Sequence, residues 1–315
     1  MMARFVLWRL LSALLLLWLA SMLIFFTLTL APGDAAVQAL GEHATPQALQ
    51  TLRHQFGLDR PVAARYWQWL NGILRGDPGI SLTSQQPVVD IIAPAARRSA
   101  LLALMAACGM LLLGGTGGVL AAMHRDRWQD RLLSFIAMSG LSTPEFIVAT
   151  LMILLLAVGA GWFPAVSLLP ASGNISDQWS ILVLPALTLA LIGGCYLLRM
   201  IRASLIRLTD APNILSARLN GVRGLTLVAR HLLPQAAGPL AQLFAASLPY
   251  LIGGAVVVER VFGFPGLGEL LLTALNTRDT ILLQGVAMLL ALITALCWFA
   301  ADVLAVWLDP WRRRS

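Results

Sequence analysis

Long apolar stretches, separated by short segments that carry arginine, run through the whole chain. A helix rises 1.5 Å per residue, so about 20 apolar residues cross the roughly 30 Å hydrocarbon core of a membrane. Six windows meet this requirement, and they are residues 10–30, 99–123, 132–162, 180–198, 236–258 and 280–301. The pattern predicts an all-α, polytopic membrane protein with six transmembrane helices.

Two of these windows have features that a simple transmembrane helix does not. The third is too long for one span, and Pro144 predicts either the end of an interfacial helix or a kink. The first follows Arg4 and Arg9, as the core of a signal peptide would. Its uncharged run is longer than the roughly 7–15 apolar residues of a signal peptide, so we expect an uncleaved helix.

The composition argues against the soluble classes of protein. Hydrophobic residues make up 58% of the 315 residues and charged residues 12%, whereas a soluble domain carries roughly 25% charged residues. Too few polar side chains remain to cover a soluble globule, which excludes a cytosolic enzyme, a disulfide-stapled domain and a disordered scaffold. Cys108, Cys195 and Cys297 lie inside apolar runs, and we expect small core residues there.

The charge pattern predicts how the helices are oriented. All 22 basic residues are arginine, and the net charge is +7. With the N-terminus inside, fourteen arginines fall in inner segments, and the short outer loops hold only Arg260 and Arg278. Both termini are therefore expected in the cytoplasm, and membrane topology explains the basic charge better than nucleic-acid binding does.

The outer segment after the first span, residues 32–98, has helix signals of its own. A first helix is expected over residues 46–57, and a second one, bearing Tyr66, after a turn at residues 58–61. Residues 76–79 predict a further turn. The segment is expected to form a small ordered cap, which either meets a soluble partner or covers the helix bundle.

The cytoplasmic stretch, residues 199–235, contains the signal of one short helix. Pro212 suits the first turn and Gly221 the C-terminal stop. The apolar side of this helix consists of Ile214, Leu215, Ala217 and Leu219. A helix of about nine residues is marginal alone in water, so it must dock either onto its own bundle or into a cytoplasmic partner.

The last outer loop, residues 259–268, is dense in glycine and proline, which predicts a tight bend or a re-entrant segment. It lacks lysine and the GxxxxGKS/T pattern, so a phosphate-binding loop is not expected. Ionisable residues in spans are default candidates for function. The pathway and gate candidates are Glu145, Glu259, Pro265, Gly266 and Gly268.

The acidic residues near the spans also have structural interpretations. Glu145 either lines a pathway or pairs with an inner-face arginine, and we favour the pairing. Glu259 is expected to accept hydrogen bonds from backbone N–H groups of the loop that follows it. Asp302 is expected to be partly solvated or to pair with the arginines at 312–314.

No metal site is expected on this chain. All four histidines lie outside the predicted spans, and they are His43, His54, His124 and His231. Nickel prefers imidazole or other borderline ligands, and the spans offer no cluster of these. We therefore predict that the chain binds no metal and no cofactor, and that any metal it carries passes as a chelate.

Eight motifs, in order and at matching spacing, resemble the inner-membrane permeases of binding-protein-dependent ABC importers, in the dipeptide/oligopeptide/nickel branch. They are Pro32-Gly33-Asp34, residues 57–61, 76–81 and 124–127, Arg202-Ala203-Ser204, residues 217–221 with Arg230-His231, residues 259–268, and Leu308-Asp309-Pro310. The resemblance covers essentially the whole chain. It implies a type I importer permease fold with a first span (1–31), a helical extracytoplasmic insertion (32–98) and a core bundle (99–315).

In such permeases a short cytoplasmic helix, the coupling helix, sits in a cleft of the ATP-binding subunit. The resemblance gives this role to Pro212, Ile214, Leu215, Ala217, Arg218, Leu219, Gly221 and His231. The chain departs from the family pattern at Asn220, where lysine is usual, near Ile214, where an aromatic is usual, and at Gln235, where asparagine is common.

The resemblance also implies alternating access in a bacterial inner membrane. The implied partners are two ATP-binding subunits, which use ATP and Mg²⁺, a second homologous permease and an extracytoplasmic binding protein. The chain has no P-loop and is not expected to be an enzyme. The cargo stays open between small peptides and nickel or metal-chelate complexes, and the turn at residues 124–127 and the compact region of the third span resemble nickel-type members more closely. A secondary transporter and a membrane assembly protein are the alternatives from other classes.

Overall fold

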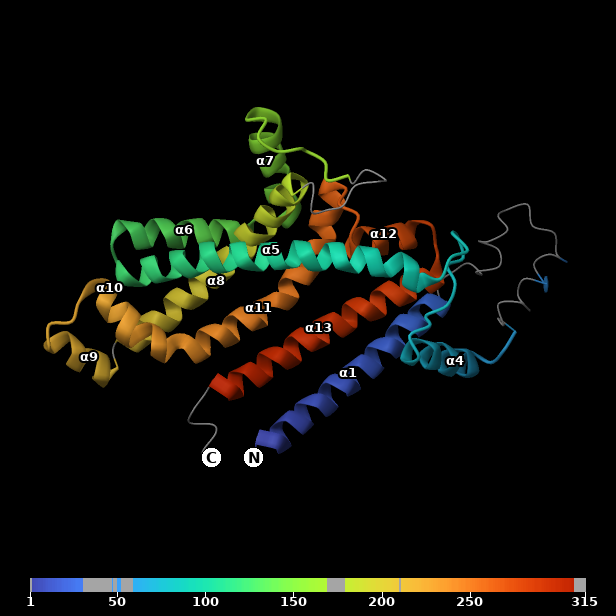
Figure 1. The fold of residues 1–315 in the computed structure, drawn as a ribbon, viewed down its shortest axis with the longest axis horizontal. Coiled ribbons are helices and arrows are strands. Elements are labelled where there is room, and N and C mark those ends of the chain that lie inside the picture. The colour runs from blue at the N-terminus through green and yellow to red at the C-terminus, as the bar shows by residue number, and fades with distance from the viewer. Residues whose placement is uncertain are drawn as a thin grey trace. The chain divides into compact units, whose positions relative to one another are not determined.

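The structure, a computed structural model, describes residues 2–30, 47, 50–51, 59–168, 179–209 and 211–308 (Figure 1). Its α-helices are α1 (Met2–Leu30), α4 (Val62–Leu74), α5 (Val88–Met123), α6 (Trp128–Ser142), α7 (Glu145–Met152), α8 (Ser180–Thr209), α9 (Pro212–Leu219), α10 (Gly224–Leu227), α11 (Leu233–Phe262), α12 (Leu267–Asn276) and α13 (Thr280–Leu308). Two π-helical segments are η1 (Ile153–Gly159) and η3 (Val228–Leu232). The only strand-like pairing in these residues is an isolated bridge between Ile80 and Pro87, so the all-α prediction is confirmed.

Five helical segments are long and apolar enough to cross a membrane, namely α1, α5, α8, Gly224–Phe262 (α10, η3 and α11 together) and α13. The sixth candidate is a bent pair, in which α6 and the segment Glu145–Gly159 meet at 109°. Thr143 at the break has an extended backbone, as residues before proline do, and Pro144 cannot continue the hydrogen bonds of α6. The described residues thus hold five candidate spans, or six if the bent pair is one span, as predicted, and the break at Pro144 is confirmed.

Two helices run beyond their predicted windows. Helix α5 begins at Val88, eleven residues before the apolar window, and α8 continues to Thr209, eleven residues after its window. Both extensions carry arginine, including Arg98 and Arg202. A hydropathy window ends at such residues, whereas the helix continues because arginine is a good helix former.

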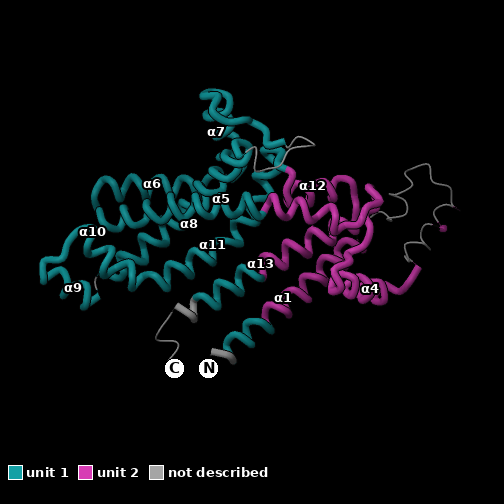
Figure 2. The backbone as a smooth tube through the Cα atoms, in the orientation of Figure 1, with its two compact units in different colours: residues 1–11, 100–264, 296–315 teal, residues 12–99, 265–295 magenta. Residues whose placement is uncertain are grey.

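The chain forms two compact units, shown in different colours in Figure 2. Unit 1 comprises residues 1–11, 100–264 and 296–315, and unit 2 comprises residues 12–99 and 265–295. The division into 1–31, 32–98 and 99–315 separates the chain by proposed role and stays a prediction.

Unit 1 is built around α8, since 72% of the most apolar part of this helix is buried. Small residues bring α5 close to it. A Cβ at Gly114 would lie 2.7 Å from the carbonyl oxygen of Gly194, and one at Gly118 would lie 2.7 Å from Cβ of Ile201. Such small-residue contacts let helix backbones approach closely within a membrane, where dispersion and not water exclusion drives helix packing.

Unit 2 holds the helical part of the outer segment. Helix α4 packs on α1 through an aromatic cluster in which the rings of Phe25 and Tyr66 are 5.5 Å apart. The Tyr66 hydroxyl and Ser21 Oγ share a hydrogen bond of 2.9 Å. The second predicted helix of the outer segment is thus confirmed, whereas residues 46–57 lie largely outside the described residues.

A buried carboxylate fixes the loop that follows α4. Asp279 is 1% exposed and accepts hydrogen bonds from the Ser81 hydroxyl and from the backbone N–H groups of Thr83 (3.1 Å) and Leu282 (3.0 Å). The last of these bonds caps the start of α13. Gly76 and Gly79 before this loop both have positive φ, which confirms the predicted turn.

Candidate functional site

The short helix predicted in the cytoplasmic stretch is α9, and local signals fix both of its ends. Pro212 occupies the first turn, where its missing N–H has no partner to lose. At the other end the N–H of Gly221 bonds the Arg218 carbonyl (3.0 Å) and that of Val222 bonds the Ala217 carbonyl (3.1 Å), the Schellman pattern. Gly221 has φ +81°. The predicted helix and its stop are confirmed.

The apolar residues of α9 point in two directions. Ile214 is fully buried and Ala217 is 8% exposed, and both belong to the core of unit 1. Leu215 and Leu219, which are 54% and 81% exposed, face away from that core, and Leu225 on α10 is 71% exposed. The helix therefore docks on its own bundle with one face and presents leucines on the other.

The remaining predicted coupling residues lie around this helix. Arg218 and Gly221 are exposed. His231 is half-buried on η3, and η3 is one of the elements against which α9 packs. A π-helical turn widens the helix locally, and such turns are frequent at functional sites.

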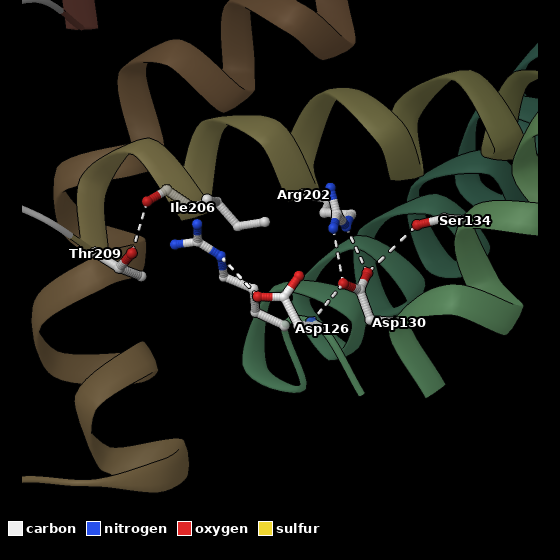
Figure 3. A network of polar contacts seen from close by, with 7 residues as sticks. Asp126, Asp130, Ser134, Arg202, Ile206 and Thr209 are labelled. Atoms are coloured by element: carbon white, nitrogen blue, oxygen red, sulfur yellow. Dashed lines mark hydrogen bonds and ion pairs between the residues drawn. The ribbon is translucent and has the colours of Figure 1, made fainter. Parts of the chain in front are cut away.

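A buried ion pair holds the end of α8 that leads to α9 (Figure 3). Asp130, 2% exposed, accepts hydrogen bonds from Arg202 Nε and, at 2.7 Å, from Arg202 Nη2. The same carboxylate accepts the backbone N–H of Asp126 (3.0 Å) and the Ser134 hydroxyl (3.3 Å). The turn between α5 and α6 is thereby fastened to α8.

Sequence reasoning selected only one partner of this pair. Arg202 belongs to a motif of the resemblance, whereas Asp130 was not singled out. The available signal was its position in the first turn of α6, within a run of alternating charges from Arg125 to Arg131. An acidic residue there is favoured by the positive end of the helix dipole, and its arginine partner is 72 residues away.

Glu145 faces α11. Its carboxylate shares a hydrogen bond with the Tyr250 phenol, and it covers Gly254, where a Cβ would lie 2.8 Å from Glu145 Oε1. These neighbours lie in the half of α11 that leads to Gly263. The favoured pairing with an inner-face arginine is therefore wrong for the described residues, because the bend at Pro144 directs α7 toward α11. The pathway role of Glu145 stays a prediction.

Helix α11 ends beside Glu259 with a second Schellman pattern. The N–H of Phe264 bonds the Glu259 carbonyl at 2.8 Å, and Gly263 has φ +61°. Glu259, Phe262 and Phe264 are fully buried. The expected bonds from loop N–H groups to the Glu259 carboxylate, and its pathway role, stay predictions.

The loop before α8 completes this end of unit 1. The N–H of Ser167 donates to the Phe262 carbonyl at 2.7 Å, and the Ser167 hydroxyl donates to the Ile181 carbonyl at 2.6 Å. The Phe262 carbonyl belongs to the last turn of α11, and the Ile181 carbonyl lacks its helical partner because Pro185, four residues on, has no N–H. One residue thus satisfies an unpaired carbonyl in each of two helices. Sequence reasoning did not select Ser167, and no local signal marks it.

The remaining gate candidates lie in unit 2, at the start of α12. Gly266 precedes the first residue of this helix, and the N–H of Leu267 donates to Ser99 Oγ at 2.7 Å. Gly268 is buried, and the Pro265 carbonyl accepts a 3.4 Å bond from Arg98. The predicted break of the chain is confirmed, and a gating role for Pro265, Gly266 and Gly268 stays a prediction.

Asp302 is partly solvated, as expected, since its side chain is 24% exposed, and it also has an ion partner that sequence reasoning did not select. Its Oδ1 lies 3.1 Å from Nη2 of Arg9, on the first helix. The arginines at 312–314, which the sequence suggested as partners, lie outside the described residues. The ion pair shows that the first part of α1 and the last part of α13 lie at the same end of unit 1.

The described residues contain no group of three or more histidine, cysteine or acidic side chains that could hold a metal ion. Cys108 is exposed on α5, so the expectation of three core cysteines is wrong for this residue. Cys195 is half-buried, where its sulfur would lie 2.6 Å from a Cβ at Gly140.

Comparisons with known proteins agree with this architecture. The family described as "Binding-protein-dependent transport system inner membrane component" matches residues 114–314, and its N-terminal domain family matches residues 2–94. The chain is 33% identical over 309 residues to "Glutathione transport system permease protein GsiC" of Escherichia coli (strain K12) and of Shigella dysenteriae serotype 1 (strain Sd197). Each alignment covers 98% of this chain and 98% of the relative.

A solved structure shares the fold. It is titled "Inward facing conformations of the MetNI methionine ABC transporter: CY5 SeMet soak crystal form", with a TM-score of 0.59 and 19% identity. The match covers 70% of this chain and 96% of that one. The family model, together with the long apolar helices, defines a polytopic inner-membrane component of a transport system. The chain belongs to the binding-protein-dependent transport system inner membrane component family, a family of non-catalytic ABC importer permeases.

Proposed function

We propose that this chain forms one half of the membrane pathway of an ATP-driven importer of small peptides, and that α9 couples it to an ATP-binding subunit. The observation that carries the proposal is the division of α9 into two faces. Ile214 and Ala217 anchor the helix in unit 1, while Leu215 and Leu219 remain exposed. A partner that covers these leucines would move α9, and α9 would move the bundle in which it is anchored.

The proposed orientation places α9 and both termini in the cytoplasm. The arginine distribution supports this side, because inner segments carry most of the arginines. The ion pair between Arg9 and Asp302 supports a common side for the two termini. Six spans, an even number, agree with this arrangement.

The proposed assembly has two ATP-binding subunits, a second homologous permease and a substrate-loaded binding protein on the outer face. ATP and Mg²⁺ bind to the ATP-binding subunits, whose closure drives alternating access. The second permease fits an apolar groove of about 790 Å³ lined by α5, α8 and α11, including Leu112 and Phe244. Such a groove supports packing against another apolar helix.

The proposed cargo is a small peptide. Support comes from the relatives, which are named glutathione transport permeases and align over nearly the whole chain. A nickel chelate, the other cargo considered from the sequence, is favoured by the turn at residues 124–127 and by the compact region of the third span. The turn has a packing role as well, because the Asp126 N–H bonds Asp130.

The coupling role is tested by placing a charge on the exposed face of α9. Leu219→Asp should leave the permease folded, because Leu219 is 81% exposed. It should abolish co-purification with the ATP-binding subunits and reduce uptake at least about tenfold, since burying an unpaired carboxylate in an interface is costly. Thr226→Asp, at an exposed position of α10, is the matched control. Retained ATPase association and uptake in Leu219→Asp would falsify the coupling role.

The cargo is tested separately by uptake in a deletion strain. Cells that carry the transporter should accumulate labelled glutathione or a labelled dipeptide, and an excess of the unlabelled peptide should compete. Accumulation of a nickel chelate, without competition by peptides, would replace the peptide assignment and leave the coupling role standing.

A further inference from the structure

Unit 2 contains an apolar groove and, next to it, a basic basin. The groove, about 650 Å³, lies among α1, α4, α5 and α13, and its lining includes Leu17, Ile92 and Met288. The basin, about 480 Å³, is lined by Arg65, Arg75 and polar residues of the turn after α4. Pro78 lines both, so the two spaces lie side by side.

The groove has the chemistry of an acyl-chain site. Its lining side chains are apolar except for Ser21, whose hydroxyl is already bonded to Tyr66 and to the Trp18 carbonyl. Gly285 lets α13 lie close to α5, since a Cβ there would lie 2.9 Å from Val88. A polar cargo would gain no hydrogen bond in this space, whereas a hydrocarbon chain fits it.

The basin has the chemistry of a phosphate site. Within residues 59–168 and 265–308, the Arg65 and Arg75 guanidinium groups form no ion pair, and Asp77 uses Oδ1 to accept the Gly79 N–H at 3.1 Å. Trp69 also lines the basin, and its buried Nε1–H has no acceptor among the described residues. Two arginines and an unused donor together favour an anion with several acceptor oxygens.

The depth of the basin agrees with a lipid headgroup. Helix α4 packs on α1 at Ser21 and Phe25, which lie 5–9 residues, or roughly 7–14 Å, before the end of α1 at Leu30. Trp67 on the same helix is 59% exposed. Tryptophan and tyrosine gather where hydrocarbon meets headgroups, so α4 lies at the membrane interface.

We infer that unit 2 binds one anionic phospholipid, with its phosphate on Arg65, Arg75 and Trp69 and one acyl chain in the groove between α1 and α13. Bound there, the lipid fastens the outer helix α4 to the spans. The site is separate from α9 and does not depend on the proposed coupling role.

Native mass spectrometry of the purified transporter complex tests this site. Palmitoyl-oleoyl phosphatidylglycerol and phosphatidylcholine have the same chains and differ in headgroup charge. We expect the first to be retained at least about tenfold better, because both lipids carry the phosphate but only phosphatidylcholine also carries a trimethylammonium cation, which the two arginines repel. Equal retention of both lipids would overturn the inference.

Matched variants locate the site. Arg65→Gln and Arg75→Gln together should reduce retention of phosphatidylglycerol about tenfold, whereas Arg60→Gln should not, because Arg60 bonds Gln68 and does not line the basin. Ala93→Phe should fill the groove, and Ala100→Phe, exposed on the same helix, is its control. Unchanged retention in the arginine double variant contradicts the site, even if Ala93→Phe fails to fold.

A third experiment distinguishes binding of a lipid from binding of free phosphate. Inorganic phosphate added to the delipidated complex should not raise the thermal midpoint, whereas phosphatidylglycerol should, since the acyl chain contributes most of the buried surface. Stabilisation by phosphate equal to that by the lipid would mean that the basin is only an anion site, and the inference would be wrong.

Discussion

Helices α9 and α11 of unit 1 both end with a Schellman pattern at a glycine, but the surroundings of the two glycines differ. Helix α9 stops at Gly221, where a Cβ would meet no atom within 4 Å. Helix α11 stops at Gly263, where a Cβ would lie 3.4 Å from Val166, beside the fully buried Phe262 and Phe264. At the Gly263 end the two phenylalanines that flank the glycine are covered within the chain. The Gly221 end leaves leucines uncovered, as a docking surface requires.

The largest expected effect is at the filled end. Phe262→Ala should destabilise the protein by about 3–5 kcal/mol, because it removes a fully buried aromatic ring and leaves a cavity. Leu219→Ala, at the open end, should change the free energy of unfolding by less than about 0.5 kcal/mol. Denaturant titrations of the purified protein in mixed micelles measure both. Similar losses for the two variants would remove the contrast between the ends.

The ion pair behind α9 gives the next largest effect. Arg202→Ala leaves Asp130 buried without its cationic partner and should cost about 2–3 kcal/mol. This lies below the cost of breaking a fully buried pair, because the Arg202 side chain is 29% exposed.

Arg207→Ala removes an exposed arginine from the same helix and is the matched control. ATPase association should fall in Arg202→Ala and persist in Arg207→Ala. If the two variants unfold alike, the pair does not hold the end of α8.

Alanine should cause similar backbone strain at Gly221 and at Gly263, but the two variants should differ in the property that changes. An alanine at either positive φ costs about 1–2 kcal/mol locally. Gly263→Ala should lower the free energy of unfolding by that amount, since Phe262 and Phe264 on either side of it are fully buried and the chain cannot fray there. Gly221→Ala should leave unfolding nearly unchanged and weaken ATPase association, because only the end of α9 can fray. Gly221→Asn should keep most of the association, as asparagine tolerates positive φ.

The smallest expected effect concerns Ser167. Ser167→Ala removes the hydroxyl bond to the Ile181 carbonyl and keeps the backbone bond to Phe262. The loss should be about 1 kcal/mol in the same titration. No measurable loss would mean that water replaces the hydroxyl at this end.

Local signals predicted the elements better than their surroundings. Pro212 and Gly221 gave the ends of α9, because capping depends on residues within a few positions. The same sequence did not separate Ile214 from Leu215, since burial depends on which neighbour the helix meets. Glu145 was placed beside arginine for a similar reason: Pro144 predicts a break and not its direction.

Contacts between distant residues could not be predicted from one sequence. Asp130 and Arg202 are 72 residues apart, and Asp279 accepts bonds from a loop almost 200 residues away. Each of these carboxylates lies near a helix start, so capping explains its position and not its partner. Hydropathy predicted the spans, and short motifs predicted the family. The contacts between distant residues depend on packing.

The ion pair between Arg9 and Asp302 has a consequence for biosynthesis. These residues are about 290 positions apart, so ribosomes that add 5–20 residues per second need roughly 15–60 s to pass from one to the other. The first span must be inserted long before its contact with the last one exists. The ion pair between the first and last helices therefore forms late in synthesis. A chain truncated before the last span cannot form it.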